Sequence, residues 1–263
     1  MAFRIANHSI RMVWANLDDV LKLTLVPYIV IAFASALLGI AFTGSPTWGG
    51  SNFDMAAQVA DGGFANEAVS FTETIGSFLN LVIYLVLAAW LAIGWHRFVL
   101  AEEYPSGFMP AWNGPRIRSY VGRVVLILVV FFGVSFVAAL VVVGLANVSQ
   151  LVAAPLGIVI VLGITIFYVR ISIMLPAISM DRQDFGLKAA LEATKPFQLV
   201  ILGTIAVYAL YTIGMVLAML LVLSIAPFLA MPFQLILEYL LLLVGISTLT
   251  TIYGVAVEGR ELT

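Results

Sequence analysis

The sequence predicts an all-α, polytopic membrane helix bundle, in which six transmembrane helices form three hairpins of a single domain, residues 1–263. Three observations predict this fold class. Hydrophobic residues make up 63% of the chain and charged residues 10%, against about 25% charged in an ordinary soluble domain. Six apolar stretches are long enough to cross a bilayer. One arrangement of these six stretches across the membrane places all 12 lysines and arginines on the same side.

The six stretches follow from the length that a spanning helix needs, which is about 20 largely apolar residues for about 30 Å of hydrocarbon. They are residues 23–42, 78–100, 124–146, 151–175, 199–223 and 231–253. Only residues 147–150 separate the third stretch from the fourth, and a short turn around Pro227 separates the fifth from the sixth. These tight connections predict antiparallel hairpins.

The orientation is predicted from the basic residues, which bacterial inner membranes retain on the cytoplasmic side. They lie before the first stretch, between the second and third, between the fourth and fifth, and after the sixth. The long outer loop, residues 43–77, contains none and carries the four carboxylates Asp54, Asp61, Glu67 and Glu73. We therefore expect a multi-pass protein of a bacterial inner membrane, with both termini in the cytoplasm. Because Arg4, Arg11 and Asp18 interrupt the N-terminal segment, we expect no cleaved signal peptide.

Residues 1–22 predict an amphipathic helix at the cytoplasmic membrane surface, because apolar and polar residues alternate at helical spacing from Phe3 to Leu21. Residues 185–197 repeat this pattern. Residues 108–120 also contain an aromatic and several basic side chains, but Pro110 and Pro115 break the periodicity. The sequence thus permits a threefold repeat of surface segment plus hairpin with a degraded middle copy. The alternative is that any basic loop beside a membrane has this character.

The first candidate polar site is Glu238, about 10 Å inside the sixth helix at 1.5 Å per residue. Gln234 lies one turn before it on the same face, and Asn80 has a similar depth on the second helix. An ionisable side chain at this depth is costly and is a functional candidate. Glu238 could bind a cation or relay a proton, or it could be a single carboxyl group held by Gln234 or Asn80.

The second candidate is Arg170, which lies about 28 Å from the outer end of the fourth helix, at the inner edge of the hydrocarbon. It could bind a lipid phosphate or pair with Glu102 or Glu103. His96 and Arg97 end the second helix at the same depth and are further candidates for binding a lipid phosphate or forming an ion pair. With Trp95 they are also typical of an interfacial anchor.

Other chemistry has little support in the sequence. The absence of cysteine excludes thiolate chemistry and disulfides, and the net charge of −2 gives no basic field for nucleic acid. With only two histidines and no phosphate-binding glycine loop, we expect no metal site, no cofactor and no enzymatic activity.

Two segments carry a resemblance to a known group: residues 95–102, WHRFVLAE, and residues 170–177, RISIMLPA. Through them the chain resembles a broad group of six-helix bacterial membrane proteins without assigned activity. That group is similar to the membrane domain of some glycerophosphodiester phosphodiesterases. The resemblance implies the six-helix architecture and a bacterial inner membrane. It does not imply hydrolysis, because the chain has no room for the catalytic barrel.

The leading functional hypothesis is a non-enzymatic membrane protein that acts through helix and lipid contacts. It would be an accessory subunit of a larger membrane complex or a membrane-organising protein, with membrane lipids and other membrane subunits as its partners. Small residues such as Ala88, Ala89 and Ala92 would allow close helix packing. The alternative is a small transporter or lipid-handling protein that uses Glu238 and Arg170.

Overall fold

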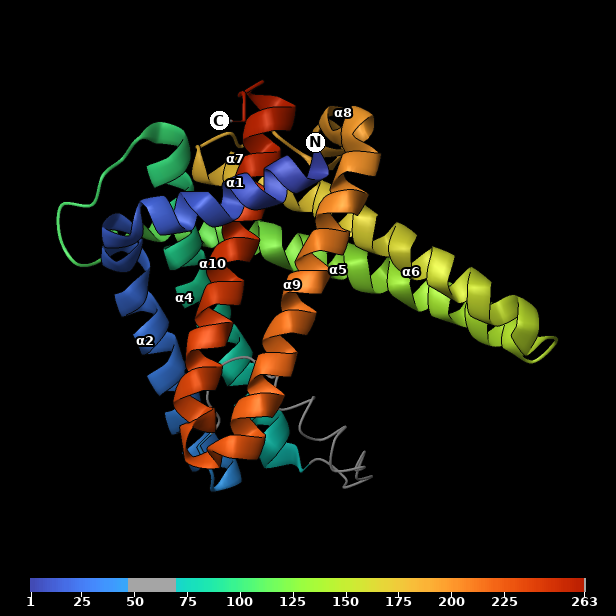
Figure 1. Ribbon diagram of the computed structural model, residues 1–263, viewed down its shortest axis with the longest axis horizontal. Coiled ribbons are helices and arrows are strands. Elements are labelled where there is room, and N and C mark those ends of the chain that lie inside the picture. The colour runs from blue at the N-terminus through green and yellow to red at the C-terminus, as the bar shows by residue number, and fades with distance from the viewer. Residues whose placement is uncertain (47–69, 263) are drawn as a thin grey trace.

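The computed structural model describes residues 1–46 and 70–262, and within them all regular structure is helical (Figure 1). Six helical stretches of these residues are long and apolar enough to cross a membrane. The prediction of an all-α bundle with six spanning helices is therefore confirmed. Of the loop carboxylates singled out from the sequence, Asp54, Asp61 and Glu67 lie outside the described residues.

The N-terminal segment forms two helices, α1 (Ala2–Ala15) and α2 (Leu17–Thr43), which Asn16 separates. The Asn16 side chain donates to the carbonyl of Met12 at 2.8 Å, so it takes a position at the end of α1 where backbone acceptors are free. Helix α4 (Phe71–Ala101) packs along α2. It begins earlier than the apolar stretch, because Ser70 and Glu73 form a reciprocal capping box, so residues 71–77 are helical.

The second hairpin consists of α5 (Gly114–Ala146) and α6 (Gln150–Ser172). Asn113 caps α5 by accepting a hydrogen bond from the backbone of Arg116 at 3.1 Å, and Pro115 occupies the first turn. Residues 102–113 contain no helix, and residues 114–120 are the first turns of α5, so the middle segment, residues 108–120, forms no separate surface helix. The short helix α7 (Met174–Ser179) follows a break at Ile173. Pro176 explains the break, because it has no backbone N–H to donate to Ser172.

The last part of the chain comprises α8 (Leu187–Thr194), a 3-10 turn (Lys195–Phe197), α9 (Gln198–Ile225), a second 3-10 turn (Pro227–Leu229) and α10 (Ala230–Val257). In the most apolar part of α10, 56% of the residues are buried inside the protein, compared with 6% in α5. Helix α10 is therefore the central helix of the described chain, whereas few residues in the most apolar part of α5 are fully buried.

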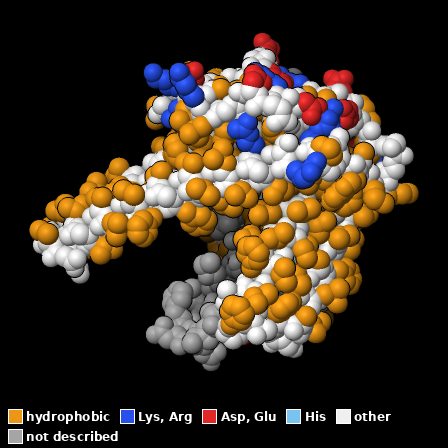
Figure 2. All heavy atoms as spheres, turned by 180° about the vertical axis from the view of Figure 1, so that it is seen from behind, with side chains coloured by type: hydrophobic (Ala, Val, Ile, Leu, Met, Phe, Trp, Pro, Cys, Tyr) orange, Lys and Arg blue, Asp and Glu red, His pale blue; other side chains and the backbone are white. Residues whose placement is uncertain are grey.

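The helices form two arms that meet at one end of the molecule (Figure 1). Helices α2, α4, α9 and α10 make up the bundle, and the α5–α6 hairpin diverges from it. Helix α1 lies across α9 and α10. Both termini, α7 and α8 lie where the arms meet, and the lysine and arginine side chains gather there as well (Figure 2). We call this region the charged end and the opposite region the far end.

A hydrophobic core lies just beneath the charged end. Its fully buried members include Ile171, Ile173 and Met174 around the α6–α7 break, with Ile201 of α9 and Tyr253 of α10. Because these side chains come from both arms, they hold the hairpin to the bundle at this level. The far ends of the two arms are separate (Figure 1).

Candidate functional site

An ion-pair cluster connects three separate segments at the charged end. Arg97 of α4 forms a bidentate pair with Glu103 and also donates to Asp181 at 3.2 Å and to the carbonyl of Ser179 at 2.9 Å. Arg116 of α5 donates to both carboxylate oxygens of Asp181, at 2.9 and 2.7 Å. Asp181 therefore links the end of α4 to the start of α5, and Arg97 acts as an ion-pair residue, as one of the two sequence hypotheses proposed.

The cluster perturbs its two carboxyl groups in the same direction. The hydrogen bonds and charge of Arg116, followed by those of Arg97, hold the pKa of Asp181 below its usual range. The Arg97 guanidinium likewise lowers the pKa of Glu103. The sequence did not single out Asp181 or Arg116, because 65 residues separate them and no local pattern indicates their contact.

Arg170 has a different role from the pairing with Glu102 or Glu103 that the sequence suggested. Its Nε donates to the hydroxyl of Thr194 at 2.9 Å, and its Nη2 donates to the carbonyl of Leu191 at 2.5 Å. Both acceptors lie in the last turn of α8, where backbone carbonyls are unpaired and a positive charge is stabilising. Glu103 pairs with Arg97 instead. Arg170 therefore joins α6 to α8.

His96 is completely buried between three helices. Its Nδ1 lies 2.8 Å from Thr250 Oγ1 of α10, and its Nε2 lies 3.3 Å from the hydroxyl of Tyr120 of α5. Since Thr250 donates its own proton to the carbonyl of Ile246, His96 must donate from Nδ1 and accept from Tyr120 at Nε2. Trp95 is also fully buried. The expectation of an exposed interfacial anchor is therefore wrong for Trp95 and His96, because both face the helix packing.

The intramembrane polar residues occupy two places. Gln234 donates to Glu238 Oε1 at 3.1 Å within α10, as their spacing predicted. Asn80 of α4 accepts a hydrogen bond from Ser35 of α2 at 2.9 Å. Glu238 is 8% exposed and has Tyr28 within electrostatic range. This arrangement gives Glu238 neighbouring polar groups in the packed interface of α10.

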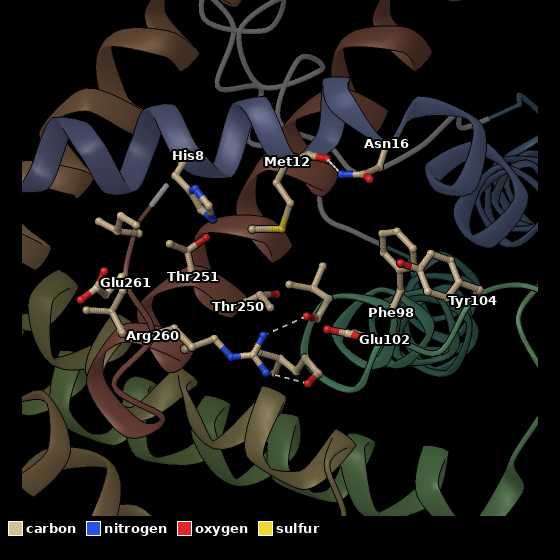
Figure 3. Close-up of a pocket in the computed structure, with 15 residues that line it drawn as sticks. His8, Met12, Asn16, Phe98, Glu102, Tyr104, Thr250, Thr251, Arg260 and Glu261 are labelled. Atoms are coloured by element: carbon tan, nitrogen blue, oxygen red, sulfur yellow. Dashed lines mark hydrogen bonds between the residues drawn. The ribbon is translucent and has the colours of Figure 1, made fainter.

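A polar pocket of about 390 Å³ opens at the charged end, beneath α1 (Figure 3). Glu102 and Arg260 line it, together with His8, Glu261 and Thr250. The Arg260 guanidinium donates to the carbonyls of Val99 and Leu100 at 3.2 and 2.7 Å, so it caps the end of α4. The pocket could accept a small polar molecule. Neither His96 nor Arg170 lines it, although Thr250 connects its wall to His96.

A second cavity, of about 450 Å³, lies between α6, α9 and α10. We call it the lateral cavity. Its lining includes Tyr168 and Val169 of α6, Ile205 and Tyr208 of α9, and Leu249 of α10. A hollow of about 380 Å³ with basic side chains lies beside Arg170 and α8. Neither cavity was predictable from the sequence, because both depend on how helices from later parts of the chain pack against α6.

Within residues 1–46 and 70–262, no group of three or more histidine, aspartate or glutamate side chains is placed to hold a metal ion. No protein-family model, curated protein or solved structure matches this chain. The functional argument therefore depends on its own geometry.

Proposed function

We propose that the chain is a non-enzymatic protein of a bacterial inner membrane that acts through helix and lipid contacts, as an accessory subunit of a membrane complex or as a membrane-organising protein. The proposed orientation places the charged end, with both termini, in the cytoplasm. The twelve basic residues support it, because cytoplasmic segments of inner-membrane proteins retain lysine and arginine.

The divergence of the α5–α6 hairpin from the bundle is the observation that carries this proposal. The hairpin is joined to the rest of the chain at the charged end and exposes apolar side chains along its length, such as Val129, Phe136 and Val159. Inside a bilayer, these exposed apolar side chains would contact lipid chains or helices of another protein. Such an open shape suits a protein whose partners are lipids and membrane subunits.

Purification of the tagged protein in a mild detergent tests the proposal. We expect a second membrane protein or a defined lipid to co-purify at a fixed ratio. A lone monomer with neither would contradict the proposal.

Lipid handling is the second candidate, and the lateral cavity is the observation that favours it. A transport mechanism would in addition need Glu238, which lines none of the three cavities described above. Replacement of Glu238 by Gln tests this candidate. Loss of uptake or of a growth phenotype at an unchanged protein level would favour transport over the accessory role.

A further inference from the structure

The wall of the lateral cavity is mainly apolar. The hydroxyl protons of Thr165, Ser172 and Thr204 are donated to backbone carbonyls one turn earlier, at 2.7 to 2.9 Å. Tyr208 donates to the carbonyl of Leu241 at 3.1 Å. Because these protons are used inside the protein, the wall presents mainly methyl, methylene and ring surface. A hydrocarbon chain fits such a wall better than a polar solute does.

The volume of the lateral cavity is also suitable for a bound small molecule. Its 450 Å³ lies within the range of about 300–1,000 Å³ that is usual for small-molecule sites. Tyr168, which lines the cavity, is 37% exposed, so this part of the cavity wall is accessible from outside the protein. A lipid chain could therefore enter from the bilayer without crossing the packed core.

The basic hollow lies at the charged end between α6 and α8, and the 3-10 turn at Lys195 connects α8 to α9. Arg170, Lys188 and Lys195 line it together with one carboxylate, Glu192, which leaves a net charge of +2. Arg170 follows the wall residue Val169 in α6, and Lys195 precedes the wall residue Ile201 by about 9 Å at 1.5 Å per residue. The basic hollow and the lateral cavity are therefore close enough for a single phospholipid to reach both.

We propose that the protein binds one anionic phospholipid, with an acyl chain in the lateral cavity and its phosphate beside Lys188 and Lys195. This inference rests on the proposed orientation, because the charged end must face the anionic cytoplasmic leaflet. Charge complementarity selects an anionic headgroup over a zwitterionic one. Arg170 holds α8 in place at the rim, while the two lysines, which are exposed, supply the charge that meets the headgroup.

Native mass spectrometry of the full-length protein, titrated with phosphatidylglycerol or phosphatidylcholine in detergent, tests the proposal. We expect a one-to-one adduct that favours phosphatidylglycerol. Lys188→Gln and Lys195→Gln should each weaken it about fivefold, as expected for loss of one basic side chain near an anionic surface. Thr248→Phe, which fills the cavity, should weaken the binding of both lipids. Inorganic phosphate alone should not compete.

Two substitutions act as matched controls. Lys22→Gln removes a lysine from the charged end that lies outside the basic hollow, and Leu162→Phe enlarges an exposed side chain of α6 that does not line the cavity. Both should leave the adduct unchanged. Equal affinity for the two lipids, competition by inorganic phosphate, or equal effects of site and control variants would overturn the proposal. If a partner protein co-purifies while the lysine variants change nothing, the proposed function stands and this lipid site fails.

Discussion

Asp181 shows how a single residue connects distant parts of this chain. It accepts hydrogen bonds from Arg97 and Arg116, which are 84 and 65 residues away. It also adopts a left-handed backbone conformation, with φ of 61°, which asparagine tolerates as well as aspartate does. Replacement of Asp181 by Asn should therefore remove the charge without straining the turn.

We predict that Asp181→Asn lowers the free energy of unfolding in detergent by about 1 kcal/mol or less, because the pair is partly exposed and screened. The effect should depend on pH. The folded protein lowers the pKa of Asp181, so the ion pairs of Asp181 contribute their full stabilisation at pH values above the ordinary aspartate pKa of about 3.9. This stabilisation is lost as the pH falls through the lower pKa that Asp181 has in the folded protein.

Thermal unfolding of both proteins between pH 3 and 7 checks this prediction. The stability difference should be constant at neutral pH and should shrink below about pH 4. Asp184→Asn, a neighbouring exposed carboxylate, is the control and should have little effect. If the stability difference between the two proteins grew as the pH fell, the ion pairs of Asp181 would not be its cause.

At this scale, the sequence indicated Gln234 as one of two possible partners of Glu238, because both residues lie on one helix and helical spacing determines their distance, and Gln234 does donate to Glu238. It did not predict the partners of Arg97, Arg170 or His96. Those partners come from other helices, and a single sequence does not indicate which helices are neighbours. Trp95 illustrates the same limit, because its place in the second spanning helix was predictable while its burial against other helices was not.

At the scale of elements, Arg170 connects α6 to the last turn of α8 through two hydrogen bonds. We predict that Arg170→Ala loosens α8, because hydrogen bonds from charged groups contribute about 1.5–3 kcal/mol. Faster amide hydrogen exchange in residues 187–197 should result. Arg118→Ala, at an exposed position of α5, should leave this exchange unchanged. Unchanged exchange in both variants would mean that α8 is held by its apolar contacts alone.

The spanning helices were predictable as elements, because bilayer thickness sets a minimum apolar length that few other structures satisfy. Their ends were less predictable. The capping box at Ser70 and Glu73 lengthens α4 into the expected loop, and the break at Ile173 precedes Pro176 by three residues. Local hydrogen bonds determine these helix ends, so counting apolar residues does not predict them.

At the scale of the whole molecule, the divergence of the arms was not predictable. When a helix is apolar on all sides, its sequence does not indicate which side packs against another helix and which side faces lipid. We predict that paired cysteines at Val159 of α6 and Leu217 of α9 form no disulfide, since these residues are 63% and 61% exposed and the two helices diverge away from the charged end (Figure 1). Paired cysteines at Val142 and Gly157 should form one, because a Cβ at Gly157 would lie 3.6 Å from a Val142 methyl group. Gel mobility under oxidising conditions distinguishes the two pairs.

The proposed lipid site and partners depend on one claim, which is that the chain crosses the membrane six times with its charged end in the cytoplasm. The natural absence of cysteine allows a direct measurement, with single cysteines at Val148, Phe228 or Tyr104, which are 86%, 80% and 70% exposed. A membrane-impermeant maleimide should label the cysteines at Val148 and Phe228 in intact spheroplasts, and the cysteine at Tyr104 only after permeabilisation. Labelling of the Tyr104 cysteine in intact spheroplasts, or different accessibility of the Val148 and Phe228 cysteines, would contradict the six-span arrangement with a cytoplasmic charged end.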